Sequence, residues 1–69
     1  MASTREQIGN RLAIERKVKG LKQAEVGQLL GCHLNKISII ERGIRTLDAV
    51  ELSALADAGF DVDYIINGV

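Results

Sequence analysis

Apolar residues recur every three or four positions along most of the chain, as they do on one face of an α-helix. Five segments show this spacing, and polar residues or glycines separate them. We predict helices over about 4–19, 21–30, 34–41 and 46–58, followed by one or two helical turns within 61–67. No stretch alternates apolar and polar residues for long enough to indicate a sheet. The pattern therefore predicts an all-α fold, a compact bundle of five short helices.

Residues at the ends of these segments indicate how the helices begin and stop. Ser3 and Glu6 have the spacing of a capping box for the first helix. We expect Thr46 to cap the fourth helix and Asp61 the last one. Gly31 offers the left-handed conformation that ends the second helix.

The same spacing indicates which side chains form the core. The expected inward positions are Ile8, Leu12, Ile14, Val18, Val26, Leu29, Leu30, Ile37, Ile40, Phe60, Val62 and Ile65. Glu41 shares the inward face of its helix, and an acid in that position needs a partner.

The chain is short, with 69 residues, 46% of them hydrophobic, and no proline. A domain of this size buries only about 60% of the surface that its unfolded chain exposes, so we expect one domain, residues 1–69, with a thin core. One cysteine excludes an intrachain disulfide and fits a reducing compartment. No apolar run approaches the roughly 20 residues that cross a bilayer, and the N-terminal segment lacks the apolar part of a signal peptide. We expect a cytoplasmic protein without membrane contact.

Charge is divided unevenly along the chain, although the net charge is zero. Residues 1–45 hold nine basic and four acidic residues, a balance of +5; residues 46–69 hold five acids and no base, a balance of −5. This division favours one surface for a polyanion and another for solvent or a partner. Chance sorting of solvated helix faces explains it equally well, so charge by itself does not decide.

Residues 23–42 meet the requirements of two helices joined by a tight turn. Gly31 permits the turn, Gly27 is a small residue at the helix contact, and Cys32 is a small apolar plug. The second helix of such a pair protrudes enough to enter the major groove of DNA, which is about 12 Å wide.

These residues resemble the Cro/phage-repressor class of helix-turn-helix proteins, the XRE family. The stretches that carry the resemblance are GLKQAEVGQLLG, KISIIERG and VDYIING, and it extends from about Ile8 to Gly68. It implies a lambda-repressor-like DNA-binding domain with a helix-turn-helix motif at about 23–42 and a core-capping and dimerisation segment at about 60–69. Three positions depart from the usual family residues: Lys22 and His33 replace Ser or Thr caps, and Gly27 replaces an Ala.

The resemblance implies base contacts from the outward face of the 34–41 helix, by Leu34, Asn35, Ser38 and Ile39. Asn35 can pair with adenine, and Ser38 with several bases or a phosphate. Aliphatic side chains can contact thymine methyl groups. We expect partial burial for Leu34 and a methyl contact for Ile39, and a protein partner is the alternative for Ile39.

The resemblance also implies contacts that position the protein on DNA without reading its sequence. We expect these phosphate contacts from Lys22, Gln23, Lys36, Arg42 and Arg45. It further implies a structural ion pair between Arg16 and Glu41, and an isologous dimer contact through Tyr64, Ile66 and Val69. A dimer would place two reading helices about 34 Å apart, which matches a palindromic operator.

Other kinds of site find little support. Cys32 and His33 are too few ligands for structural zinc, and the single histidine lacks a plausible nucleophile partner. We therefore expect no enzyme activity, no metal or other cofactor, and no small-molecule ligand.

The sequence thus predicts a homodimeric, sequence-specific transcription regulator, a repressor of Cro or prophage-repressor type that covers promoter DNA. A restriction-modification controller or an antitoxin-type autoregulator is the alternative within the class. A protein-interaction module with the same fold, using Leu34 and Ile39 as its contact, is the alternative outside it; its binding would depend little on salt, unlike binding to phosphates.

Overall fold

The computed structural model describes residues 2–69; Met1, which the predicted domain includes, lies outside the described residues. No strand occurs within residues 2–69, and the prediction of an all-α fold with five helices is confirmed. The helices are α1 (Arg5–Val18), α2 (Gln23–Leu30), α3 (Leu34–Glu41), α4 (Ala49–Asp57) and α5 (Val62–Asn67). Across the described part of the chain, no helix has the length and apolarity needed to cross a membrane.

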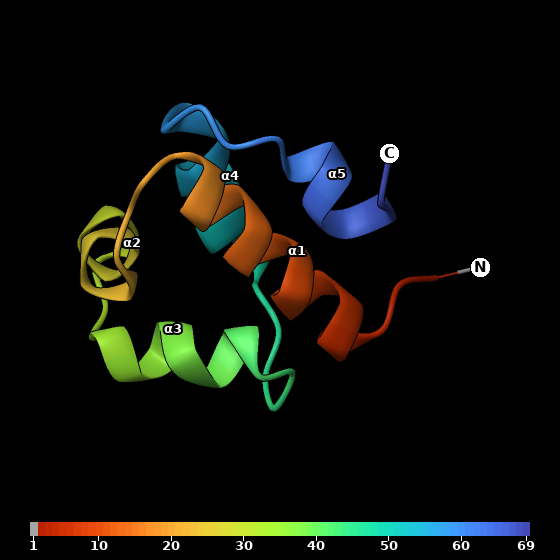
Figure 1. Cartoon of the computed structure of the whole chain (residues 1–69), viewed down its shortest axis with the longest axis horizontal. Coiled ribbons are helices and arrows are strands. Elements are labelled where there is room, and N and C mark those ends of the chain that lie inside the picture. Colours follow the sequence, from red (N-terminus) through yellow and green to blue (C-terminus); the bar gives the residue numbers. More distant parts are fainter. Residues whose placement is uncertain (1) are drawn as a thin grey trace.

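α1 runs through the middle of the molecule (Figure 1). It packs against both α3 and α5, while α2 packs against α3 and α4. α3 lies along one edge in Figure 1, so the helix after the turn is carried at the margin of the bundle.

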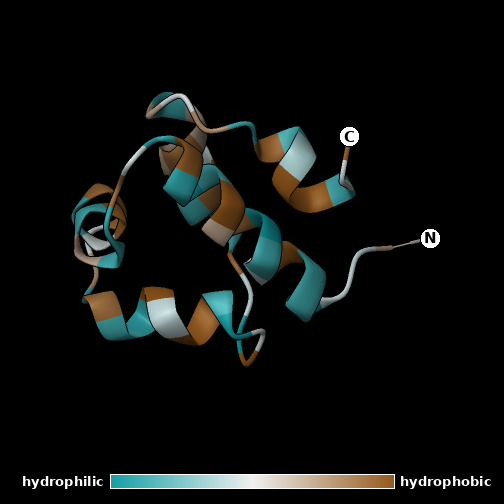
Figure 2. Ribbon diagram, viewed as in Figure 1, coloured by the Kyte–Doolittle hydropathy of each residue, from teal (hydrophilic) through white to brown (hydrophobic). Residues whose placement is uncertain are grey.

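One cluster of apolar side chains fills the space between the helices. Its buried members are Leu12, Val26, Ile37, Ile40, Leu47, Leu55, Phe60 and Ile65. Hydrophobic and hydrophilic positions alternate around the helices in Figure 2, as expected where one face of each helix is covered. Most of the predicted inward positions therefore belong to this cluster or pack against it.

Three aliphatic side chains that were expected inside are exposed. The exposed fraction is 41% for Ile14, 77% for Val18 and 44% for Leu29. Ile14 is turned about 200° around the helix from the buried Leu12, and Leu29 about 100° from Leu30, which packs against the core. The apolar arc of these helices is broader than the face that their neighbours cover.

The capping box of α1 lies one residue later than expected. Thr4 Oγ1 accepts a hydrogen bond from Gln7 N at 3.1 Å, and Gln7 Oε1 accepts one from Thr4 N at 2.8 Å. The predicted box of Ser3 and Glu6 is wrong, because Ser3 Oγ accepts a hydrogen bond from Arg11 at 2.7 Å. Both pairs have the spacing of a capping box, and the contact with Arg11 engages Ser3 elsewhere.

The cap of α4 is Asp48, and the predicted cap at Thr46 is wrong. Asp48 Oδ1 accepts a hydrogen bond from Glu51 N at 2.7 Å, and Glu51 Oε1 accepts one from Asp48 N at 2.9 Å. Leu47 is buried in the core immediately before this cap. Burying Leu47 places Asp48, and not Thr46, at the start of the helix.

Candidate nucleic-acid interface

The turn between α2 and α3 depends on two glycines. Gly31 adopts the expected left-handed conformation, with φ at +69°, at the end of α2. Cys32 N donates a hydrogen bond to Gly27 O at 2.8 Å. A Cβ atom on Gly27 would lie 2.7 Å from the Cys32 carbonyl oxygen, so packing requires glycine where the family usually has alanine.

The starts of α2 and α3 are held in ways that replace the usual Ser or Thr caps. At α2, the side chain of Glu25 reaches back, and its Oε1 accepts a hydrogen bond from Lys22 N at 2.8 Å. At α3, His33 Nδ1 accepts a hydrogen bond from Asn35 N at 3.1 Å. His33 therefore caps the helix after the turn. Within residues 2–69, no group of three His, Cys, Asp or Glu side chains is arranged so that it could hold a metal ion.

A hydrogen-bonded ion pair joins the end of α3 to α1. Arg16 Nε and Nη2 donate to the two carboxylate oxygens of Glu41 at 2.7 and 3.0 Å, and Gln23 Nε2 donates to Glu41 Oε1 at 3.1 Å. The side chains of Arg16 and Glu41 are only 12% and 8% exposed. The hydrogen bonds with Glu41 raise the pKa of Arg16, outweighing the opposing effect of burial. This cluster fixes the end of α3 relative to α1 and the start of α2.

A close helix crossing supports the same arrangement. A Cβ atom on Gly9 of α1 would lie 2.9 Å from the Glu41 carbonyl oxygen and nearer still to that of Ile40. In the turn after α3, a Cβ atom on Gly43 would lie 2.8 Å from Glu6 Cα. Both ends of this crossing therefore allow only a glycine-sized residue.

The outward side of α3 carries the four residues expected to read bases. Leu34 and Asn35 are exposed, whereas Ser38 and Ile39 are partly buried. The exposed fraction of Leu34 is 39%, so more than half of its surface is covered. The two isoleucines on the other side of the helix are wholly buried in the core.

The residues expected to contact phosphates fall into two groups. Three of them are exposed, namely Lys22, Arg42 and Arg45, although Arg42 Nε also donates a hydrogen bond to the Ser38 carbonyl oxygen at 3.3 Å. The side chains of the other two, Gln23 and Lys36, make contacts within the protein. Gln23 donates to Glu41, and Lys36 Nζ lies 2.6 Å from Glu51 Oε2. No local spacing joins Lys36 to Glu51, so the sequence gives no signal of this pair.

A basic side chain that the sequence analysis did not single out lies beside the exposed group. Arg5 begins α1, and its Nη1 lies 3.5 Å from the carbonyl oxygen of Ile44. Ile44 belongs to the α3–α4 loop, which also carries Arg45. The sequence of a helix start does not indicate which distant loop it meets, and only packing brings this arginine to the loop.

α5 is attached to α1. Arg11 Nη1 donates to the carbonyl oxygen of Ile66 at 3.3 Å, where a cation suits the C-terminal end of a helix. Asp61 Oδ1 accepts a hydrogen bond from Tyr64 N at 3.0 Å, so the predicted cap of α5 is confirmed. Of the residues expected at a dimer contact, Tyr64 and Ile66 are partly buried and Val69 is 87% exposed.

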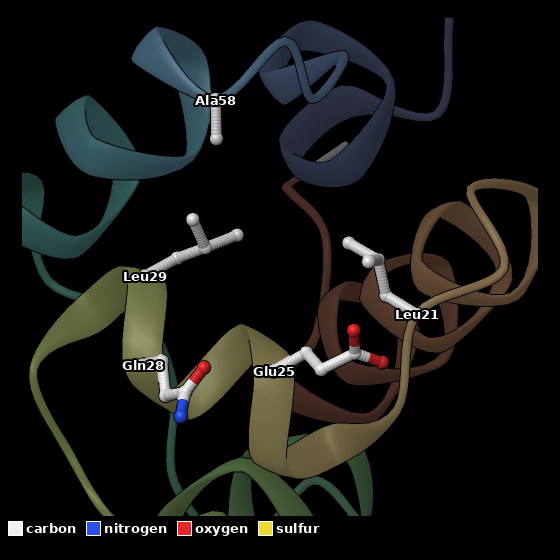
Figure 3. A pocket seen from close by; sticks show the side chains of 5 residues that line it. All are labelled: Leu21, Glu25, Gln28, Leu29 and Ala58. Atoms are coloured by element: carbon white, nitrogen blue, oxygen red, sulfur yellow. The ribbon is translucent and has the colours of Figure 1, made fainter.

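A hollow of about 500 Å³ lies between α2, the segment before it and the end of α4 (Figure 3). Its lining residues are Leu21, Glu25, Gln28, Leu29 and Ala58. None of them belongs to the outward side of α3, so the hollow is not part of the candidate interface.

In this structure a helix follows a tight glycine turn and lies at the margin of a bundle of short helices (Figure 1). This is the arrangement of a helix-turn-helix protein. The family described as "Helix-turn-helix domain" matches residues 7–63, and the chain belongs to it. No curated protein matches the chain significantly.

Two solved structures show the same fold. The P22 c2 repressor protein, in complex with a synthetic operator, is 30% identical with a TM-score of 0.79, over 90% of this chain and 96% of that chain. The restriction-modification controller protein C.AhdI from Aeromonas hydrophila is 28% identical with a TM-score of 0.79, over the same shares of the two chains. The resemblance to the Cro/phage-repressor class and the lambda-repressor-like fold are thereby confirmed.

Proposed function

We propose that this protein is a transcription regulator that binds double-stranded DNA by sequence, as a homodimeric repressor of Cro or prophage-repressor type. The observation that carries the proposal is the construction of α3. One side of this helix is buried and clamped through the Arg16–Glu41 pair, and the other side faces outward. The similarity to a repressor in complex with an operator supports DNA as the partner.

The size and chemistry of α3 suit a major groove. An α-helix with its side chains is about 10–12 Å across, and the major groove, which is about 12 Å wide, admits it. The exposed amide of Asn35 can make two hydrogen bonds to adenine, and Ser38 can bond several bases. Ile39 would contact a thymine methyl group, and so would the exposed part of Leu34, which would explain the aliphatic residues on the outward side of α3.

Exposed cations around α3 would hold the phosphates. Lys22 lies immediately before α2, and Arg42 and Arg45 follow α3. Arg5 lies beside the same loop. Gln23, at the start of α2, would place its amide near the backbone while it also orients Glu41. These contacts would fix register without reading sequence.

A homodimer would form through the C-terminal segment. Val69 is exposed, and Tyr64 and Ile66 each keep part of their surface accessible. A two-fold axis there would present two α3 helices to half-sites about one DNA turn apart. Such a dimer would cover a palindromic operator and block access to promoter DNA.

Two other functions have an observation in their favour. The similarity to C.AhdI favours a restriction-modification controller, which would also bind DNA. A protein-interaction module with the same fold would use Leu34 and Ile39 as its contact; Leu34 is 39% exposed, and Ile44 in the following loop, at 59%, would extend this apolar surface.

Selection of binding sites from random duplex DNA at two salt concentrations tests the proposal. We expect a two-fold symmetric motif and an affinity that falls steeply with salt, because each neutralised phosphate releases counterions. Recovery of no motif, together with no salt-sensitive binding, would contradict DNA recognition and favour the protein-interaction module.

A further inference from the structure

A buried carboxylate in α4 faces the helix that would read DNA. Glu51 is 6% exposed, although it lies in the first turn of a short surface helix. Its Oε1 accepts a hydrogen bond from Asp48 N at 2.9 Å. Its Oε2 is covered and accepts no well-aligned hydrogen bond within residues 2–69, yet it lies 2.6 Å from Lys36 Nζ. The ammonium group of Lys36 is therefore what balances this buried charge.

Lys36 connects α3 to an element that α3 otherwise scarcely touches. The main packing partners of α3 are α1 and α2, whereas Glu51 belongs to α4. Lys36 stands between Asn35 on the exposed side and Ile37 in the core. Its side chain is 29% exposed, so it is mostly covered. An ion pair at this position restrains the rotation of α3 about its own axis. It therefore also restrains the direction in which Asn35 points.

We propose that Lys36 is a positioning residue, held by Glu51 so that Asn35 points at its base, and that it does not contact a DNA phosphate. This inference rests on the proposed function. Moving the ammonium to a phosphate would leave the Glu51 carboxylate buried without a counter-charge, which is strongly unfavourable. A phosphate contact at the solvated, salt-screened surface contributes a much smaller favourable free energy. The pair therefore persists when DNA binds.

The first test measures the salt dependence of DNA affinity, using the site selected above. Each phosphate contact contributes about 0.9 to the slope of log K against log salt concentration. We expect the double variant Lys36→Met/Glu51→Gln to keep the slope of the unmodified chain, while its discrimination at the base read by Asn35 falls several-fold. The control Arg45→Ala should lower the slope by about 0.9 and keep discrimination. A lower slope in the double variant would overturn the inference.

The second test needs no DNA. Lys36→Met should lower the midpoint of urea unfolding, because Glu51 then keeps a buried, unbalanced charge. Adding Glu51→Gln should restore most of the loss, since the amide oxygen still accepts the hydrogen bond from Asp48 N. Lys17→Met, which removes an exposed lysine of α1, should leave the midpoint unchanged.

The conservative variant Lys36→Arg keeps the cation and should retain both the midpoint and base discrimination. Equal midpoints for Lys36→Met and Lys17→Met would overturn the inference, because the Lys36–Glu51 pair would then make no contribution to the fold. If the unmodified chain shows no salt-dependent DNA binding, the proposed function fails, and the positioning role fails with it even where the unfolding data show the pair.

Discussion

Two buried carboxylates hold α3 near its two ends. Glu41, the last residue of the helix, accepts hydrogen bonds from Arg16 of α1, and Glu51 of α4 faces Lys36 in the first turn. Each carboxylate is mostly covered, so each requires its cation. At the residue scale, the direction of the outward side chains depends on charges that they do not touch.

Arg16→Met should lower the free energy of unfolding by about 3–5 kcal/mol, because Glu41 is left buried without a counter-charge. The raised pKa of Arg16 means that its contribution is complete below the ordinary arginine pKa and is lost only at higher pH. The loss measured by urea unfolding should therefore be the same from about pH 6 to about pH 9. Lys17→Met, at the exposed neighbouring residue, is the control; a comparable loss there would contradict the assigned role.

Asn35→Ala and Arg42→Ala should affect DNA binding differently. Loss of the Asn35 amide should relax one base preference by about 1–3 kcal/mol, whereas loss of the Arg42 cation should weaken all sequences alike. Competition between the selected site and single-base variants of it measures both effects. If the two substitutions lower every affinity uniformly, the outward side of α3 does not read bases.

At the element scale, the number of helices and the buried side of α3 could be predicted, because apolar spacing is a local property. The caps of α1 and α4 could not be predicted. Thr4 and Gln7 form the capping box of α1, although Ser3 and Glu6 have the same spacing. Asp48 caps α4 because Leu47 is buried before it. Where the sequence offers two caps, tertiary contacts decide between them.

Gly27→Ala should destabilise the protein, although alanine favours helix by roughly 1 kcal/mol. The new Cβ would meet the Cys32 carbonyl oxygen at 2.7 Å, and such overpacking costs about 1–3 kcal/mol. Thermal or urea unfolding measures the change. Gln28→Ala, at the exposed next position, should change stability by less than about 0.5 kcal/mol. A gain in stability for Gly27→Ala would show that the Cys32 backbone can shift away from the new Cβ atom.

At the scale of the whole molecule, charged residues from the basic part of the chain contact its acidic C-terminal part. Asp61 N donates to Glu15 Oε1 at 2.9 Å, and Lys19 Nζ lies 5.2 Å from the centre of the Phe60 ring. Arg11 bonds the end of α5. Arg11 and Glu15 of α1, and Lys19 just after it, therefore contact the C-terminal part of the chain, and fewer cations remain for a polyanion than the sequence count indicates.

Val69→Asp tests the proposed dimer with little risk to the fold, because Val69 is 87% exposed. Two charges facing each other across a two-fold axis should weaken association. We therefore expect lower affinity for a full palindromic site and unchanged affinity for a single half-site, measured in the same titration. An equal effect on both sites, or none on either, would place the dimer contact elsewhere.

The helical class, the glycine turn after α2 and the core positions of α3 could be predicted from the residues alone, because they follow from local spacing and from backbone conformations that few residues adopt. The family resemblance also implied the ion pair between Arg16 and Glu41. Helix packing determines which apolar residues of α1 and α2 stay exposed, which residues cap α1 and α4, and that Lys36 faces Glu51. Those outcomes depend on which helices meet and how closely, and a chain's local pattern does not contain the distances between its distant parts.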